Sequence, residues 1–346
     1  MTSKKTVQRK KEHIELCLTD NVVFKTKTNG FENYEFEHYA ITEIEFEKLD
    51  LTTKFFGKKI SLPFLISSMT GGTFEAERIN EKLAIVANIL NIPIGVGSQR
   101  QALEDNTHHS TYKVVRKNAG SVPILGNIGA SQVIKSKDLV GDFERLIDLI
   151  EANALIIHVN ILQELLQPEG EPNFKGLLKK LGKAIPRLKT PIVVKEVGSG
   201  ISKKAAKRLL EIGVKGIDVA GSGGTSWAAV ELLRNHRENK YLSEWGLPTS
   251  YCIRTVKELK RDYDFTLIGS GGIMNGVDTA KALALGSDIT ASARIILQEV
   301  TKNEVESVIK LINNWFLTVK QIMLLTGCDN MKKFKAGVLK RNEEFI

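Results

Sequence analysis

The chain of 346 residues contains few cysteines and no apolar segment near its start. Its three cysteines, Cys17, Cys252 and Cys328, are scattered and form no CxxC pair, so neither a disulfide framework nor a zinc site is indicated. The first residues, MTSKKTVQRKKEH, are charged and lack the apolar core of a signal peptide. We also find no apolar run long enough to cross a membrane. We therefore expect a soluble, cytoplasmic protein without a membrane segment.

Basic residues outnumber acidic ones and give a formal net charge of +9. Most lysines alternate with acidic residues along expected helical faces, which is typical of solvated surface. The exception is an N-terminal cluster that comprises Lys4, Lys5, Arg9, Lys10 and Lys11. This cluster could be a solvated arm, an anion-binding lid or a nucleic-acid arm. The last alternative lacks interleaved aromatic residues and a recognisable binding module, so we expect no nucleic-acid partner.

Apolar, β-branched runs alternate with helical patterns along the chain. Eight runs are predicted to be strands: 62–66, 92–96, 123–126, 154–159, 192–194, 216–220, 265–268 and 288–291. Helical patterns between them include 76–90, 143–151, 203–212, 249–263 and 276–285. Eight buried parallel strands alternating with helices predict an α/β fold, the TIM (β/α)8 barrel. An open doubly wound sheet would carry its nucleotide loop after the first strand, whereas the best phosphate loop here follows the seventh.

No linker divides the chain, and we expect a single barrel domain over residues 1–346. Residues 1–61 are predicted to form an N-terminal appendage, residues 62–300 the barrel core and residues 301–346 a C-terminal helix and tail. Alternating Phe36, Tyr39, Ile41, Ile44 and Phe46 suggest short strands in the appendage. The stretch 304–325 is predicted to be one long amphipathic helix.

The stretch 265–297 carries the clearest functional signal. A strand runs into Ser270-Gly271-Gly272-Ile273, and a helix, a short strand and a turn containing Ala293 and Arg294 follow. In a TIM barrel, the loops after the last two strands often form a phosphate site with backbone N–H groups at a helix N-terminus. We therefore predict a phosphorylated ligand at this turn.

Polar or glycine residues also follow six of the predicted strands, where a TIM barrel places its chemistry. Lys195 ends the fifth strand and could either extend to water or face the pyrimidine edge of a flavin. The small residues of the SSMTGG loop (67–72) would let a flavin ring approach the backbone, and Asn127 and Ser98 could hydrogen-bond its heteroatoms.

A carboxylate with amide and imidazole neighbours occurs in His158-x-Asn160-x-x-Gln163-Glu164. This set suits Mg²⁺, which keeps several waters and bridges to phosphate oxygens. It does not suit zinc, because no second histidine or cysteine lies at ligand spacing. Alternatively, Glu164 only caps or decorates a surface helix.

Taken together, these segments resemble the type 2, flavin-dependent isopentenyl-diphosphate isomerases. The resemblance extends along nearly the whole chain and is carried by QRKKEH (8–13), SSMTGG (67–72), GVGSQR (95–100), GNIGA (126–130), HVNILQE (158–164), VVKEVGSGIS (193–202), DVAGSGGTSWAAVE (218–231), WGLPT (245–249) and GSGGI (269–273). It implies a barrel that binds FMN and needs Mg²⁺ and reduced flavin, commonly supplied by NADPH. It also implies a homo-oligomer, a tetramer or octamer, that interconverts isopentenyl and dimethylallyl diphosphate without net redox change.

The resemblance also implies roles for individual residues. Expected substrate contacts are Arg9, Lys10, His13, Ser98, Gln99, Arg100, Asn160 and Gln163. Expected FMN contacts are Ser67, Ser68, Met69, Thr70, Ser98, Asn127, Lys195, Thr225, Gly271, Gly272, Ile273, Ala293 and Arg294. Glu164 is the expected Mg²⁺ ligand, and the expected catalytic residues are His158, Gln163, Lys195 and Glu231. The chain departs from the family pattern at Ser292, where a glycine is expected, and at Met274, where a basic residue is common.

Three other functions compete with this one. A flavin-dependent 2-hydroxy-acid oxidase would need a histidine and an arginine near the sixth and seventh strand ends, but His236 and Arg237 are adjacent in a predicted helix. An inosinate-dehydrogenase-like enzyme would need a nucleophilic cysteine after the phosphate region, and neither Cys252 nor Cys328 is placed there. A non-catalytic flavin-binding protein would not need the HVNILQE segment.

Overall fold

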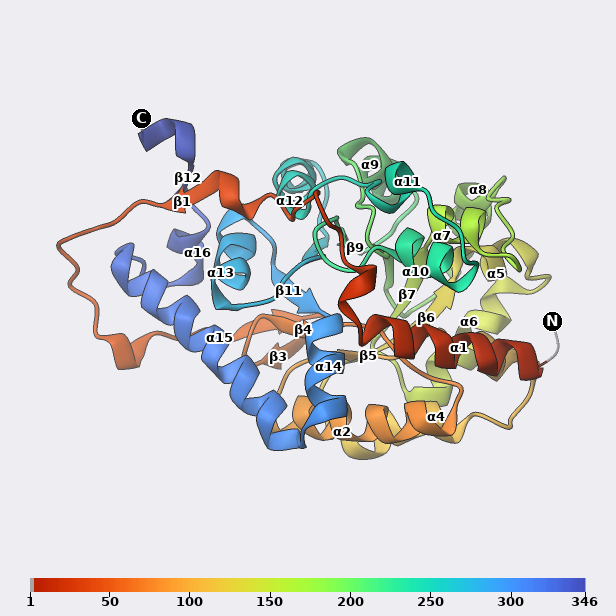
Figure 1. Cartoon of the computed structure of the whole chain (residues 1–346). Helices are drawn as coiled ribbons and strands as arrows, with labels where there is room; N and C mark the ends of the chain where they lie inside the picture. Colours follow the sequence, from red (N-terminus) through yellow and green to blue (C-terminus); the bar gives the residue numbers. More distant parts are fainter. Residues whose placement is uncertain (1–2, 346) are drawn as a thin grey trace.

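A computed structural model describes residues 3–345, and its centre is a closed barrel of eight parallel strands (Figure 1). The barrel strands are β4 (Phe64–Ile66), β5 (Ile94–Gly95), β6 (Ile124–Gly129), β7 (Ala154–Val159), β8 (Ile192–Glu196), β9 (Gly216–Asp218), β10 (Thr266–Ser270) and β11 (Ile289–Ser292). They pair in sequence order, and β11 pairs with β4 to close the barrel. The predicted TIM barrel and all eight of its strands are confirmed, although several strands begin or end a few residues away from the predicted positions.

Helices cover the outside of the barrel (Figure 1). The α-helices are α1 (Ser3–Cys17), α2 (Phe74–Leu90), α3 (Arg100–Glu104), α4 (Ser110–Asn118), α5 (Ala130–Lys135), α6 (Leu139–Ile150), α7 (Ile161–Leu166), α8 (Leu177–Ala184), α9 (Lys203–Glu211), α10 (Trp227–Arg234), α11 (Lys240–Ser243), α12 (Thr249–Lys257), α13 (Gly276–Leu285), α14 (Arg294–Lys302), α15 (Val305–Leu325) and α16 (Met331–Phe334). All five helical patterns predicted between the strands are present. Capping defines their ends: Thr73 Oγ1, for example, accepts a hydrogen bond from Ala76 N (3.1 Å) at the start of α2.

A hairpin closes one end of the barrel. Its strands, β2 (Thr53–Phe55) and β3 (Lys58–Ile60), pair in antiparallel register. Phe55 and Ile60 are buried in the same apolar cluster as Leu65, Leu125 and Ile156 of the barrel strands. This plug lies at the N-terminal ends of the strands, where Lys58 Nζ donates to Ser121 O (3.1 Å) and Phe56 lies beside Gly216, the first residue of β9.

The long helix α15 packs along the outside of the barrel against α2, α13 and α14. By length and composition alone it could cross a membrane, so the expectation that no segment reaches that length was wrong for this helix. One face of α15 is nevertheless buried against the barrel through Ile312, Trp315, Phe316 and Val319. This packing is that of a helix that completes the outer layer of the fold.

A short strand after the N-terminal helix pairs with the C-terminal tail. β1 (Tyr34–Phe36) pairs in antiparallel register with β12 (Leu339–Arg341). The further short strands suggested by the alternation after Phe36 are absent, and residues 37–45 contain no strand. Tyr39 and Ile41 are 56% and 76% exposed, because this segment is not part of a sheet whose one face would bury them.

Candidate active site

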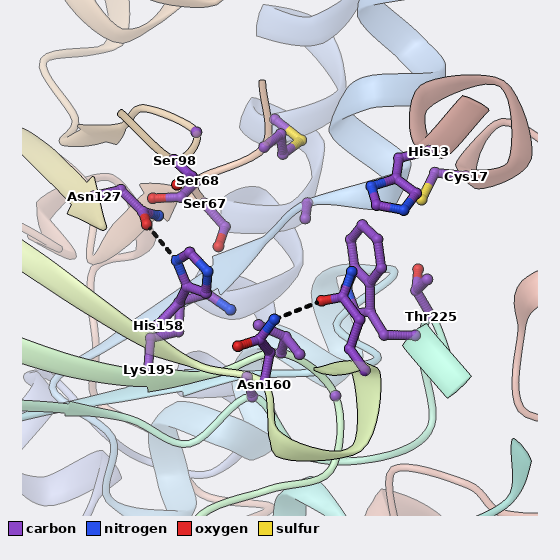
Figure 2. Close-up of a pocket in the computed structure, with 18 of the residues that line it drawn as sticks. His13, Cys17, Ser67, Ser68, Ser98, Asn127, His158, Asn160, Lys195 and Thr225 are labelled. Carbon is purple, nitrogen blue, oxygen red and sulfur yellow. Dashed lines mark hydrogen bonds between the residues drawn. The ribbon is translucent and has the colours of Figure 1, made fainter. Parts of the chain in front are cut away.

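A cavity opens at the C-terminal ends of the barrel strands and is bordered on one side by α1 (Figure 2). Twenty-one of the predicted site residues line it: Arg9, Lys10, His13, Ser67, Ser68, Met69, Thr70, Ser98, Arg100, Asn127, His158, Asn160, Gln163, Glu164, Lys195, Thr225, Gly271, Gly272, Ile273, Ala293 and Arg294. Two do not line it, Gln99 and Glu231. The segments expected to form the site, widely separated in sequence, therefore converge on one cavity.

The turn after β10 forms a cradle that a side chain would fill. Gly271 and Gly272 have φ angles of +101° and +67°, a left-handed conformation that favours glycine. A Cβ on Gly271 would lie 2.1 Å from Gly221 O, so the backbone there leaves no room for one. The N-terminus of α14 begins nearby at Arg294, and its first backbone N–H groups have no partner within the helix. This arrangement fits the phosphate of FMN.

Arg294 lines the cavity and also fixes the segment after α1. Its Nη1 donates to Thr19 O (3.2 Å) and to Asp20 Oδ1 (2.9 Å). The phosphate cradle is therefore joined directly to the chain that enters from the N-terminal helix.

Asn127, His158 and Lys195 come from the adjacent strands β6, β7 and β8 (Figure 2). His158 Nδ1 lies 2.7 Å from Asn127 Oδ1, and Lys195 Nζ donates to Glu196 O (2.7 Å). Burial, and then the positive charge of Lys195, lower the pKa of His158 to about 4. The imidazole is therefore neutral near pH 7, and the bond to Asn127 places its proton on Nδ1.

Several buried polar atoms on the cavity wall have no hydrogen-bond partner within residues 3–345. They are Ser68 Oγ, Asn160 Oδ1 and both amide atoms of Gln101. A buried polar group without a partner costs about 1–3 kcal/mol. A polar ligand such as a flavin or a diphosphate would satisfy these atoms, so the cavity fits such a group.

Behind the cavity wall, Glu231 on α10 receives hydrogen bonds from two site residues. Its Oε1 lies 2.9 Å from both His13 Nε2 and Gln163 Nε2, and Arg234 Nη1 donates to its Oε2. Burial alone would raise the pKa of Glu231, but the bond and charge of His13, the bond from Gln163 and the charge of Arg234 outweigh it and lower the pKa. Glu231 therefore orients His13 and Gln163 from behind.

Glu164 lines the cavity on α7, with donors at both oxygens. Its Oε2 accepts from Glu171 N (2.8 Å) and its Oε1 from Asn160 Nδ2 (3.2 Å). No group of three or more histidine, cysteine or carboxylate side chains that could hold a metal occurs in the described part of the chain. The donor set therefore does not suit an all-protein metal cage. It fits Mg²⁺ that is held by one carboxylate, waters and substrate phosphate oxygens.

The cations at the cavity have unequal surroundings. Lys10 Nζ donates to Gly71 O, to Ser98 O (3.3 Å) and to Tyr112 Oη (3.2 Å). Burial, followed by the charge of Arg9, lowers the pKa of Lys10 to about 7. The pKa of Arg9 is lowered by burial and then by Arg100. The guanidinium groups of Arg9 and Arg100, which repel each other, would both favour a bound anion, whereas Lys10 is bound to the two loops expected to contact flavin.

Gln99 is not positioned as a substrate contact. Its side chain is fully buried, Nε2 donates to Leu146 O (3.0 Å), and Oε1 accepts from Asn127 N (2.9 Å). Both ends of the amide are therefore used to join this loop to β6 and α6. The motif could not reveal the orientation of the Gln99 side chain, because neighbouring residues in a loop point in different directions.

The fold also brings to the site residues that the sequence had not indicated. Trp227 lines the cavity with its ring edge-on to His13 at 5.0 Å between centroids, and Gln101 lies one residue after Arg100. Trp227 lies within the motif at 218–231 and Gln101 directly follows the motif at 95–100, and these positions were the available signal. His236 and Arg237, in contrast, are exposed and do not line the cavity, which disfavours the hydroxy-acid oxidase alternative.

Comparison with known proteins identifies a matching family and relatives that share one description. The FMN-dependent dehydrogenase family matches residues 2–117 and 164–341. A Chlorobium limicola protein described as an isopentenyl-diphosphate delta-isomerase is 43% identical over 344 residues, which covers 95% of this chain and 94% of that protein. A Nostoc protein with the same description is 42% identical over 345 residues, which covers 98% of this chain and 97% of that protein.

Solved structures with the same fold are more distant in sequence. Lactate oxidase of Pediococcus acidilactici has a TM-score of 0.69 at 16% identity, covering 98% of this chain and 94% of that one. The flavin-binding domain of baker's yeast flavocytochrome b2 has a TM-score of 0.67 at 16% identity, covering 93% of this chain and 79% of that one. At this identity the likeness establishes the barrel fold alone.

Proposed function

The chain belongs to the FMN-dependent dehydrogenase family and, within it, to the isopentenyl-diphosphate delta-isomerases, and we propose that its cavity binds FMN, Mg²⁺ and the diphosphate substrate side by side. The enzyme interconverts isopentenyl and dimethylallyl diphosphate and uses FMN. The observation that supports the shared cavity is its division into a glycine cradle at β10–α14 and a region near α1 and α7 that combines cations with the carboxylates of Glu164, Glu169 and Glu171.

The substrate's diphosphate is proposed to lie among Arg9, Arg100 and Glu164. The two guanidinium groups would bind phosphate oxygens, and Glu164 would hold Mg²⁺, which would offset the negative charge of the diphosphate. Asn160, whose Oδ1 is buried without a partner in the described chain, completes this region as a hydrogen-bonding group.

The hydrocarbon part of the substrate then faces the strand ends. The reaction adds a proton at one end of the allylic system and removes one from the other, so positive charge develops on an apolar group. Reduced FMN, when bound, would supply an electron-rich ring and a proton-carrying nitrogen. Lys195 would face the flavin, where its charge would stabilise the anionic reduced ring, and neutral His158 donates to Asn127.

His13 and Gln163 are proposed to orient or relay protons, because both bond to the buried carboxylate of Glu231. Glu231 does not line the cavity, so it acts through these two side chains. The aromatic ring of Trp227 lies beside His13 and helps to exclude water.

We further propose NADPH as the reductant, assembly into tetramers or octamers, and a cytoplasmic location, all of which rest on the family. We also propose that residues 1–346 act as one domain, supported by the pairing of β1 with β12. Light scattering would give the oligomer size. Anaerobic bleaching of the flavin by NADPH would test the reductant.

An anaerobic assay tests the function directly. With isopentenyl diphosphate, FMN, NADPH and Mg²⁺, dimethylallyl diphosphate should form, and it should not form with oxidised flavin or with a chelator. Mandelate and lactate under oxygen are the comparison substrates. Their oxidation without isomerisation would favour the hydroxy-acid oxidase, and a yellow protein without turnover would favour a non-catalytic flavin-binding protein.

A further inference from the structure

Arg234, at the end of α10, joins three carboxylates from three parts of the chain. Its Nε lies 3.0 Å from Glu12 Oε2 on α1, and its Nη2 lies 3.6 Å from Glu169 Oε1 in the loop after α7. Its Nη1 donates to Glu231 Oε2 on its own helix. The arginine side chain is only 8% exposed, whereas Glu12 and Glu169 are 35% and 28% exposed. The guanidinium is therefore the buried centre of the cluster.

The same two elements also meet at Glu231. That carboxylate binds His13, which follows Glu12 on α1, and Gln163 of α7. Two residues one turn apart on α10 thus each bind both α1 and the α7 region: Glu231 through its carboxylate and Arg234 through its guanidinium. Asn235 adds a third link, because its Nδ2 donates to Leu166 O (3.2 Å).

We propose that Arg234 is a positioning residue that holds Glu231 in place and couples the seating of α1 to the loop after α7. This inference rests on the proposed role of Glu231. α1 also carries Arg9, and the α7 region carries Glu164, so the coupling joins the expected diphosphate contact to the expected Mg²⁺ ligand. A planar guanidinium can bind three carboxylates at once, which an ammonium group cannot do with the same geometry.

The charge of Arg234 also acts on the groups it positions. It lowers the pKa of both Glu231 and His13. The other charged or titratable groups near Glu231 are Arg9 and Cys17 from α1. Removal of the arginine charge therefore raises both pKa values, and more of each group is protonated at a given pH. If activity requires ionised Glu231 and neutral His13, the acid limb of the pH–rate profile moves to higher pH.

Arg234→Gln removes the charge and should lower kcat/KM about tenfold or more, with the acid limb shifted upward. Arg234→Lys keeps the charge, so the acid limb should stay near that of the wild type. Because an ammonium group cannot bind the three carboxylates in the same geometry, KM should still be higher than that of the wild type. Lys203→Gln, which breaks the exposed Lys203–Glu258 pair, is the matched control and should leave both quantities unchanged.

A purely structural arginine would give a different result. Arg234→Gln protein that retains FMN and shows the wild-type pH profile and kinetics would overturn the proposal, even if its melting temperature fell. If that variant does not fold, the double variant Glu12→Gln/Glu169→Gln replaces it, because it leaves the Arg234–Glu231 pair intact. That double variant should raise KM at least threefold, and unchanged kinetics would equally refute the coupling.

Two measurements separate this inference from the proposals on which it rests. Wild-type protein that does not isomerise isopentenyl diphosphate would remove the function itself. Glu231→Gln protein with wild-type turnover would remove the role of Glu231. Active wild type and impaired Glu231→Gln, together with unaffected Arg234 variants, would refute only the role of Arg234.

Discussion

His158 and Asn127 lie on neighbouring barrel strands, and their side chains share a hydrogen bond of 2.7 Å that fixes the histidine ring (Figure 2). A protonated imidazole would stand beside the positive charge of Lys195 on the next strand. The protein instead keeps His158 neutral, with Nδ1 as a donor and Nε2 free to accept. A neutral ring can orient a ligand without adding a further positive charge to those of Lys195, Arg9 and Lys10.

The first prediction concerns pH. The pKa of His158 is about 4 in the folded protein, against about 6.5 for an unperturbed histidine. The unfolded chain therefore binds the proton more readily, so the stability from neutral His158 is present above about pH 6.5 and is lost as the pH falls towards 4. Chemical unfolding at pH 7 and pH 4.5 should show a smaller acid loss for His158→Gln than for the wild type. The exposed His38→Gln variant is the control, and equal losses in all three proteins would contradict the prediction.

Lys195→Ala should weaken FMN retention and turnover together, because its ammonium group is expected to face the charge of the reduced ring. Loss of one charge-assisted contact, about 1.5–3 kcal/mol, corresponds to roughly tenfold or more in affinity. Flavin absorbance after gel filtration and steady-state turnover measure the two effects. The exposed Lys215→Ala, just before the next strand, is the matched control. Wild-type flavin content and turnover in Lys195→Ala would refute the assignment.

The barrel was predictable because each strand is a short apolar run and the spacing repeats. β5 illustrates the limit, since only Ile94 and Gly95 of the predicted 92–96 form the strand. The closing hairpin at Phe55 and Ile60 was not predicted, because its two three-residue strands are too short to show a period. The β1–β12 pairing could not be predicted either, since it joins residues about 300 apart in sequence.

Within the site, family motifs identified which residues lie near the cavity but not where their side chains point. Gln99 belongs to a matching motif, yet its side-chain amide bonds to the backbone of Leu146 and Asn127 and does not line the cavity. Lys10 was expected at the diphosphate, but its ammonium group bonds to backbone oxygens of two loops. Arg234 gave no signal, because two of its three carboxylate partners, Glu12 and Glu169, are distant in sequence and reach it only after folding.

Glu164→Gln keeps the side-chain shape and removes the charge expected to hold Mg²⁺. The Mg²⁺ concentration for half-maximal rate should therefore rise about tenfold or more, with FMN content unchanged. The measurement is a Mg²⁺ titration of the initial rate at saturating substrate. Glu258→Gln, at an exposed ion pair, controls for loss of a carboxylate in general. An unchanged Mg²⁺ dependence would show that Glu164 serves only to bind Glu171 N and Asn160.

The last prediction separates two adjacent cations on α1. Arg9→Ala should raise KM for isopentenyl diphosphate roughly tenfold or more without loss of FMN, because its guanidinium lies beside Arg100 and is expected to bind phosphate. Lys10→Met should raise KM and also weaken FMN retention, since Lys10 Nζ bonds to Gly71 O in the loop expected at the flavin.

Deletion of residues 1–12 removes both cations together with the Glu12–Arg234 pair, so its KM should exceed that of either single variant. The barrel strands and the phosphate cradle lie outside the deleted segment, so the truncated protein should still fold and bind flavin, with its retention weakened as in Lys10→Met. Steady-state titrations and flavin spectra of the wild type, Arg9→Ala, Lys10→Met and the truncated protein measure these effects. Equal Michaelis constants for truncated and full-length enzyme would show that this helix does not contribute to substrate binding. If Arg9→Ala lost as much FMN as Lys10→Met, the proposed difference between the two residues would be refuted.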